Sequence, residues 1–184
     1  MRILGIAGSL RSGSLNRALL RAAAELAPAG MDVHLFEGLG EIPLFNEDVE
    51  AQGDPAPVRA FKAAIQEADA LLIATPEYNY GVPGVLKNAI DWASRPAGKS
   101  PLNRKPAAIM GASMGMHGTA RAQLALRQTF VFTETCTMLR PELYLGRAHE
   151  KVDANGRLID EPTRKQIRKL LEAFAEWIGR FAAR

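Results

Sequence analysis

The sequence predicts an α/β domain built on a parallel sheet. Short continuous apolar runs alternate along the chain with segments in which apolar residues recur every three or four positions. The runs are typical of strands buried on both faces, and the spaced pattern is typical of helices that cover a sheet. The 184 residues suffice for one domain with a substantial core, and neither a repeat nor a change of composition divides them. We therefore expect a single domain over residues 1–184.

The first strand and the first helix are separated by a change in apolar spacing. Residues 3–7 form an apolar run that Gly8 ends. From Ser14 onward the apolar residues follow a helical period, which Pro28 and Gly30 stop. The chain is therefore expected to begin with a buried strand and a covering helix.

The later elements continue this alternation up to a long last helix. Apolar runs predict strands at residues 33–36, 70–74, 106–112 and 136–139, and helical spacing predicts helices over residues 58–67, 85–94 and 119–132. The last helix has the clearest pattern, because apolar residues from Ile167 to Phe181 fall on one face. Asp160 and Pro162 mark its start.

Charge and composition exclude several classes of protein. Lys and Arg number 23 and Asp and Glu 20, which leaves a formal charge of +3. So small and scattered a surplus does not indicate a nucleic-acid-binding protein. The single cysteine, Cys136, excludes an internal disulfide, and the 3 histidines are too widely spaced for a zinc pattern, so we expect no metal. The first apolar run is shorter than the core of a signal peptide, so we expect no secretion signal, and no apolar stretch approaches the roughly 20 residues that span a bilayer. We expect a cytoplasmic protein without a membrane partner.

The loop after the first strand carries the donors that a phosphate group needs. In a parallel sheet, ligands bind beyond the carboxyl ends of the strands. Ser9, Arg11, Ser14 and Asn16 lie there, directly before a helix whose N-terminus attracts anions. The dinucleotide fingerprint and the Walker lysine are both missing, which favours a terminal monophosphate over a pyrophosphate. The alternative is a loop that only turns the chain and caps the helix.

The loop after the third expected strand, residues 75–84, combines a stiff backbone with aromatic rings. Pro76 and Pro83 restrict the backbone, and Tyr78 and Tyr80 can cover a planar ligand whose polar edge meets main-chain amides. The alternative is a turn-rich crossover whose tyrosines pack on the protein.

The loop after the fourth expected strand admits two interpretations. Residues 111–115 match G-x-S-x-G, the nucleophile elbow of α/β-hydrolases. A serine hydrolase that uses Ser113 also needs an acid and then a histidine, and between Ser113 and His149 only Glu134 and Glu142 are available as the acid. Without acyl chemistry, the glycines let the main chain approach a flat ligand closely.

Taken together, the three loops resemble those of the NADPH-dependent FMN reductase family, which includes bacterial quinone, chromate and azo-dye reductases. The motifs that carry the resemblance are Gly8-Ser9-Leu10-Arg11 with Ser14 and Asn16, Pro76-Glu77-Tyr78-Asn79-Tyr80, Val82-Pro83-Gly84 through Lys87-Asn88-Ala89-Ile90-Asp91-Trp92, and Gly111-Ala112-Ser113-Met114-Gly115. The resemblance extends to about Leu145, and Gly81 departs from the serine or other small residue expected there.

The resemblance implies a flavodoxin-like three-layer sandwich with a five-stranded parallel sheet in the order 2-1-3-4-5, and bound FMN. By matching position, the residues around the FMN phosphate are Ser9, Arg11, Ser14 and Asn16, and Leu15 is a further cofactor-binding residue. Those along the isoalloxazine are Pro76, Glu77, Tyr78, Asn79, Ser113, Met114 and Gly115. No catalytic side chain is expected, because the flavin carries the redox chemistry.

The implied function is an NAD(P)H oxidoreductase that works in two steps. NADPH or NADH gives a hydride to the flavin and leaves, and a quinone or similar small acceptor, with chromate and azo dyes as further candidates, then takes two electrons. The alternative is a flavodoxin-type electron carrier, although such proteins are strongly acidic and this chain carries +3. A homodimer or homotetramer is implied by the resemblance alone. We expect Cys136 to be a buried inert thiol and His117 a local hydrogen-bonding residue.

Overall fold

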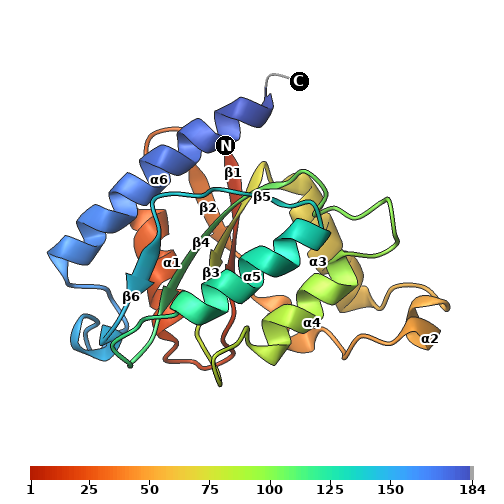
Figure 1. The fold of residues 1–184 in the computed structure, drawn as a ribbon, viewed down its shortest axis with the longest axis horizontal. Helices are drawn as coiled ribbons and strands as arrows, with labels where there is room; N and C mark the ends of the chain where they lie inside the picture. The colour runs from red at the N-terminus through yellow and green to blue at the C-terminus, as the bar shows by residue number, and fades with distance from the viewer. Residues whose placement is uncertain (183–184) are drawn as a thin grey trace.

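The computed structural model describes residues 1–182 and shows a sheet between two layers of helices (Figure 1). The strands are β1 (Arg2–Ala7), β2 (Asp32–Leu35), β3 (Ala70–Ala74), β4 (Pro106–Ala112), β5 (Cys136–Thr137) and β6 (Leu143–Leu145). The α-helices are α1 (Leu15–Leu26), α2 (Glu47–Glu50), α3 (Ala56–Glu67), α4 (Gly84–Ala93), α5 (Ala120–Phe132) and α6 (Glu161–Ala182). Short 3₁₀ turns lie at η1 (Gly38–Glu41) and η2 (Ala148–Glu150).

The sheet is parallel, in the order β2-β1-β3-β4-β5, which confirms the predicted class and strand order. The prediction of five strands was incomplete, because β6 also pairs with β4. β5 pairs with Pro106 and Ala107 at the start of β4, whereas β6 pairs with Met110, Gly111 and Ala112 at its end. Two short strands therefore share one edge position of the sheet.

The region around β5 also differs from the prediction. The strand expected at residues 136–139 ends at Thr137, and Leu139 is exposed. Cys136, expected to be buried, has intermediate exposure, because β5 is the edge strand of the described sheet and covers only two residues.

Alternate residues of each buried strand feed the two cores, since successive side chains of a strand point to opposite faces. Ile3, Leu72 and Met110 join the core beneath α1 and α6, while Leu71 and Ile109 join the core beneath α3, α4 and α5. Figure 1 shows these two helical layers. Both faces of β3 and β4 are covered, which explains their continuous apolar sequence.

The apolar face predicted for the last helix is confirmed in α6. Its buried residues are Ile167, Leu170, Leu171, Phe174 and Ile178. Asp160 precedes the helix and accepts hydrogen bonds from the main-chain N–H and the hydroxyl of Thr163, as expected for a start signal. None of the helices in residues 1–182 has the length and apolar character needed to cross a lipid bilayer.

The parallel arrangement brings the loops that follow β1, β3 and β4 to one edge of the sheet. Gly111, in β4, makes the close approach of these segments possible. A Cβ atom at this position would lie 1.9 Å from Thr119 Oγ1 and 2.4 Å from the carbonyl oxygen of Thr75. A side chain at position 111 would therefore collide with the start of the second loop and the end of the third.

Candidate flavin site

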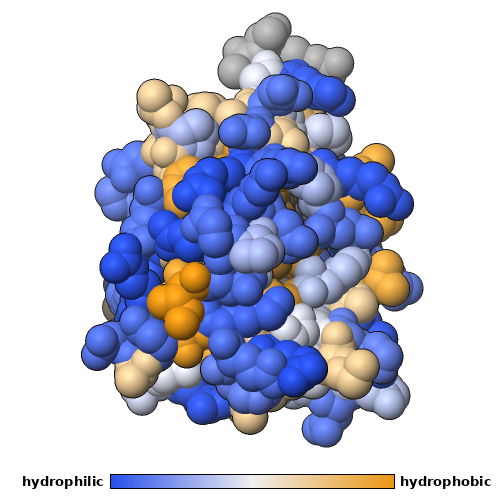
Figure 2. Space-filling view, turned by 90° about the vertical axis from the view of Figure 1, so that its left-hand side faces the viewer, coloured by the Kyte–Doolittle hydropathy of each residue, from blue (hydrophilic) through white to orange (hydrophobic). Residues whose placement is uncertain are grey.

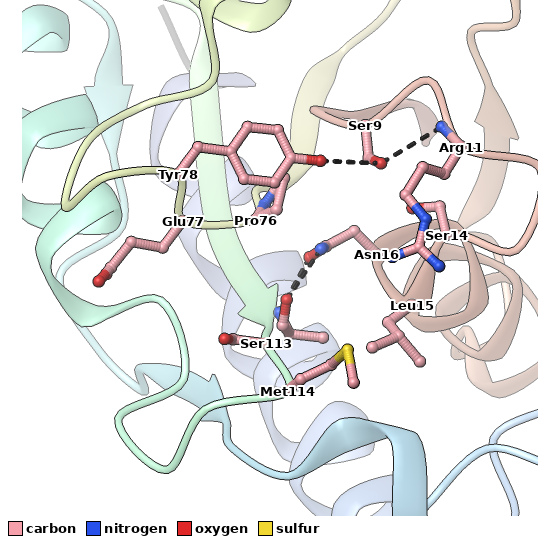
Figure 3. Close-up of a pocket in the computed structure, with 11 residues that line it drawn as sticks. Ser9, Arg11, Ser14, Leu15, Asn16, Pro76, Glu77, Tyr78, Ser113 and Met114 are labelled. Atoms are coloured by element: carbon pink, nitrogen blue, oxygen red, sulfur yellow. Dashed lines mark hydrogen bonds between the residues drawn. The ribbon is translucent and has the colours of Figure 1, made fainter.

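The three loops after β1, β3 and β4 face one another across a pocket of about 200 Å³ (Figure 3). Its lining residues are Ser9, Arg11, Ser14, Leu15, Asn16, Pro76, Glu77, Tyr78, Ala112, Ser113 and Met114. The structure thus brings together all predicted site residues except Asn79 and Gly115, which line a neighbouring cavity. Sequence reasoning missed Ala112, which is apolar and lies within a strand.

The first loop ends in a helix N-terminus that is well prepared for an anion. Ser14 is the N-cap of α1, and its Oγ accepts a hydrogen bond from the main-chain N–H of Arg17 at 3.2 Å. The first turn of α1 contains no acidic residue. The N–H groups of Leu15 and Asn16 precede the first intrahelical hydrogen bonds, so they are available to a ligand. Ser9 and Ser14 are both buried, and their hydroxyls add further polar atoms to the pocket.

Arg11 supplies a cation at the mouth of the pocket. Its side chain is exposed and lines the cavity. Within residues 1–182 its guanidinium forms no hydrogen bond or ion pair with another side chain. The charge is therefore available to a ligand rather than committed to a carboxylate of the chain.

The side chain of Asn16 has a structural task that the sequence did not reveal. It is 2% exposed, and its Nδ2 donates to the carbonyl oxygen of Ala112 at 3.0 Å while its Oδ1 accepts from the main-chain N–H of Ala112 at 2.9 Å. In Figure 3 a dashed line at the Asn16 amide marks this hydrogen bonding. The side chain predicted to donate to a phosphate thus joins the start of α1 to the end of β4.

The second loop forms a tight turn beside the pocket. Tyr78 and Gly81 exchange two main-chain hydrogen bonds of 3.2 and 2.9 Å, and both Asn79 and Tyr80 have positive φ angles, 50° and 67°. This is the geometry of the tightest two-residue hairpin turns. The turn directs Tyr78 across the pocket, where its hydroxyl lies 3.4 Å from Ser9 Oγ (Figure 3).

The carboxylate of Glu77 points away from the pocket (Figure 3). Its Oε2 accepts from the main-chain N–H groups of Arg121 and Ala122 at 3.0 and 3.2 Å, and its Oε1 accepts from Arg121 Nε at 2.6 Å. Burial alone would raise the pKa of Glu77, but the hydrogen bonds and the charge of Arg121 together lower it below its usual value. Glu77 therefore stays ionised at neutral pH and is not a proton donor.

The third loop is fixed by the strand that sequence analysis missed. The main-chain N–H of Ser113 donates to the carbonyl oxygen of Leu145 in β6, and the N–H of Ala148 donates to the carbonyl oxygen of Ser113. Ser113 Oγ accepts from the N–H of Gly115 at 3.1 Å. The main chain of this loop is thus held in place along one wall of the pocket.

This geometry does not form a nucleophile elbow. Ser113 is absent from the residues of positive φ in the described chain, whereas the elbow serine occupies a strained turn. Within residues 1–182, no histidine donates to or accepts from Ser113, whose hydroxyl serves its own loop. The serine hydrolase alternative has no catalytic arrangement here.

A second cavity of about 320 Å³ adjoins the first and shares Glu77 and Ser113 with it. Its remaining lining residues are Asn79, Tyr80, Gly115, Met116, His117, Gly118 and Arg121. His117 was expected to form a local hydrogen bond, but it forms none within residues 1–182 and lines this cavity instead. Arg121 was not among the predicted site residues, because it lies within α5, where a solvated helical face is the default.

The profile of the NADPH-dependent FMN reductase family matches residues 1–150 of this chain. The chain belongs to this family. It is 53% identical over 180 residues to an NAD(P)H-dependent FMN reductase of Pseudomonas aeruginosa, with 98% of this chain and 96% of that protein covered. It is also 43% identical to a quinone reductase of Escherichia coli, with 98% and 96% covered.

A solved structure agrees with this assignment to the FMN reductase family. The flavoenzyme NAD(P)H:(acceptor) oxidoreductase FerB from Paracoccus denitrificans has 39% identity and a TM-score of 0.88, over 97% of both chains. The resemblance inferred from the loops and the flavodoxin-like fold are thereby confirmed, as is the predicted class of oxidoreductase with FMN and NAD(P)H. The relatives give no support to the electron-carrier alternative.

The residues of the first pocket fit FMN. At one end, buried hydroxyls, a helix N-terminus and the unpaired cation of Arg11 suit a terminal phosphate. At the other, the main chain of Pro76 to Tyr78 and of Ser113 onward forms two fixed walls that suit a flat ring. The pocket therefore has one end suited to the FMN phosphate and one end suited to the flavin ring.

Proposed function

We propose that this chain is an FMN-dependent NAD(P)H:quinone oxidoreductase that holds the flavin phosphate in its first loop and the flavin ring between its second and third loops. The observation that carries this proposal is the convergence of the three loops on one pocket. The quinone-type acceptor is supported by the relatives named quinone reductase.

The phosphate end is proposed to use the hydroxyls of Ser9 and Ser14, the N–H groups at the start of α1 and the guanidinium of Arg11. Each charge-assisted hydrogen bond contributes about 1.5 to 3 kcal/mol net. Micromolar affinity requires about 8 kcal/mol. The phosphate contacts therefore need support from the ring end of the pocket.

The ring end is proposed to act mainly through the main chain. Pro76 to Tyr78 and Ser113 to Gly115 lie on preset backbone, so their amides meet the ring without a large ordering cost. When bound, FMN supplies the redox chemistry, accepting a hydride from NAD(P)H and passing two electrons to the acceptor. The chain's own residues bind and orient the reactants. Glu77 is given no proton-transfer role, because its carboxylate is ionised and accepts hydrogen bonds from the start of α5.

We assign NAD(P)H and the quinone in turn to the second cavity, which opens beside Ser113 and Tyr80. Because both reactants would use one cavity, the first product must leave before the acceptor enters. Initial rates with NADPH and a benzoquinone are expected to give parallel double-reciprocal plots. Intersecting plots would contradict the shared cavity.

The cofactor assignment is tested directly by reconstitution. The purified protein is incubated with FMN, desalted, and its visible spectrum recorded without oxygen before and after NADPH, and again after a benzoquinone. We expect a retained flavin band that NADPH bleaches and the quinone restores. A colourless desalted protein would contradict the proposed site.

We further propose a homodimer or homotetramer that buries the outer face of α5. Leu124, Val131 and Phe132 on this helix are 59%, 78% and 88% exposed, an apolar surface that a lone subunit rarely presents. The side of the molecule where α6 begins is by contrast mostly hydrophilic (Figure 2). Sedimentation of Phe132→Asp is expected to show a smaller species than the wild type, and an unchanged assembly would exclude this face.

We place the enzyme in the cytoplasm, where NAD(P)H is available; cell fractionation tests this.

A further inference from the structure

Glu77 connects the second loop to the end of the third. It lies between the pocket-lining residues Pro76 and Tyr78, yet its side chain, 6% exposed, is directed to the first turn of α5. That turn follows immediately after the loop of residues 113–119. Hydrogen bonds between the strands, such as that from Thr75 N–H to Met110 O, hold the two loops together where they begin. The hydrogen bonds of Glu77 to the first turn of α5 hold them together a second time, beyond the ends of the strands.

The same carboxylate holds Arg121 in place on an aromatic ring. Arg121 donates to Glu77 through Nε at 2.6 Å and through its main-chain N–H at 3.0 Å, and its guanidinium carbon lies 3.7 Å from the centre of the Tyr80 ring. Tyr80 is otherwise 70% exposed, on a turn with positive φ angles. The carboxylate is thus hydrogen-bonded to the guanidinium, which in turn lies over the ring, and all three residues line the second cavity.

We propose that Glu77 is a positioning residue of the reaction, which acts through Arg121 and the start of α5 to fix the second and third loops around the flavin ring and to shape the second cavity for NAD(P)H and the quinone. The inference rests on the proposed function, in which the ring lies between these loops. It changes the role expected for this side chain, from a cofactor contact to a support whose carboxylate is held by Arg121 and the first turn of α5.

The substitution Glu77→Gln tests this role, because it keeps the size of the side chain and removes the charge. An amide cannot accept from all three donors as the carboxylate does, so part of the clamp is released. Glu50→Gln is the matched control: Glu50 also accepts from an arginine Nε, that of Arg95 at 3.0 Å, and is 16% exposed, but lies outside both cavities.

The first readout needs neither flavin nor activity. In the FMN-free protein, Glu77→Gln is expected to speed amide hydrogen exchange about tenfold in residues 76–81 and in the first turn of α5, because a helix start without its acceptor opens more often. Glu50→Gln should leave both segments at the wild-type rate.

The second readout is steady-state kinetics of the flavin-loaded proteins. We expect Glu77→Gln to lower kcat/KM for the benzoquinone about tenfold, with FMN still bound one per chain, because small displacements of a substrate cavity are costly. A cycle with Arg121→Gln separates positioning from general destabilisation. Arg121→Gln removes the guanidinium but keeps the two main-chain N–H donors to Glu77, so the further loss caused by Glu77→Gln in that background should be clearly smaller than its loss in the wild type.

The outcomes separate the two levels of inference. Additive losses in the cycle, or a Glu77→Gln protein that matches Glu50→Gln in both exchange and kcat/KM, would overturn the role of Glu77 while leaving the reductase intact. A wild-type protein that retains no FMN and reduces no quinone would instead overturn the proposed function on which that role rests.

Discussion

The two ends of the first pocket are built in different ways. At the proposed phosphate end, side chains and a helix terminus line the pocket: Ser9, Arg11 and the N-cap Ser14. At the ring end, the side chain of Glu77 turns away and the walls consist largely of backbone that other contacts fix. A single side-chain truncation should therefore weaken the phosphate end directly, whereas the ring end should respond only to changes that move its backbone.

The largest expected effect is at the ring end, from Gly111→Ala. The added Cβ would lie 1.9 Å from Thr119 Oγ1 and 2.4 Å from Thr75 O, so β4 or the second loop must move. We expect a loss of about 3 kcal/mol in the free energy of unfolding, measured by urea denaturation of the FMN-free protein. In Gly179→Ala the added Cβ has no heavy atom of a neighbouring segment within 4 Å, so stability should instead rise by about 0.5 kcal/mol. Equal effects at the two glycines would refute the packing argument.

Asn16→Ala is expected to act on the joint between the two ends. The substitution leaves the buried N–H and carbonyl of Ala112 without partners, which should cost about 2 kcal/mol of unfolding free energy. The loss should appear in the FMN-free protein, again by urea denaturation. A variant as stable as wild type but weak in FMN binding would return Asn16 to the group of direct phosphate ligands.

Arg11→Ala tests the phosphate end itself. Removal of one charged donor should weaken FMN binding by about 1.5 to 3 kcal/mol, or roughly 10- to 150-fold, without a change in stability. Fluorescence titration of FMN gives the dissociation constant, and Lys165→Ala on the exposed side of α6 provides a control of equal charge. The loss should shrink as salt rises, since the guanidinium is exposed. An unchanged dissociation constant would remove Arg11 from the site.

The smallest effect is expected from Tyr78→Phe. Its hydroxyl lies at the long distance of 3.4 Å from Ser9 Oγ, so its loss should change FMN affinity by about twofold or less, while the ring remains in place. The same titration measures it. A tenfold loss would show that this hydroxyl binds the cofactor.

The sequence was sufficient to predict what depends on local pattern. The continuous apolar runs of β1, β3 and β4 predicted their burial, and the loops that follow them supplied most of the residues of the pocket. β6 was missed because Leu143 to Leu145 is too short to form a recognisable run and pairs only with the far half of β4.

Long-range side-chain contacts were beyond prediction. Asn16 meets Ala112 from 96 residues away, and Glu77 meets Arg121 from 44 residues away. Both residues belonged to the predicted site, but their types alone do not distinguish a ligand contact from a structural one. G-x-S-x-G was ambiguous for the same reason, and only the hydrogen bonds of Ser113 resolve it.

The turn at Asn79 and Tyr80 gives position 80 a residue that stability alone would not favour. A left-handed backbone suits Asn but costs a bulky residue such as Tyr about 1 kcal/mol. Glycine at position 80 would remove that cost and also the ring on which Arg121 rests. A library screened for heat resistance would thus enrich glycine at position 80, whereas a library screened for turnover would discard it. Stability and activity would therefore favour different residues at this position.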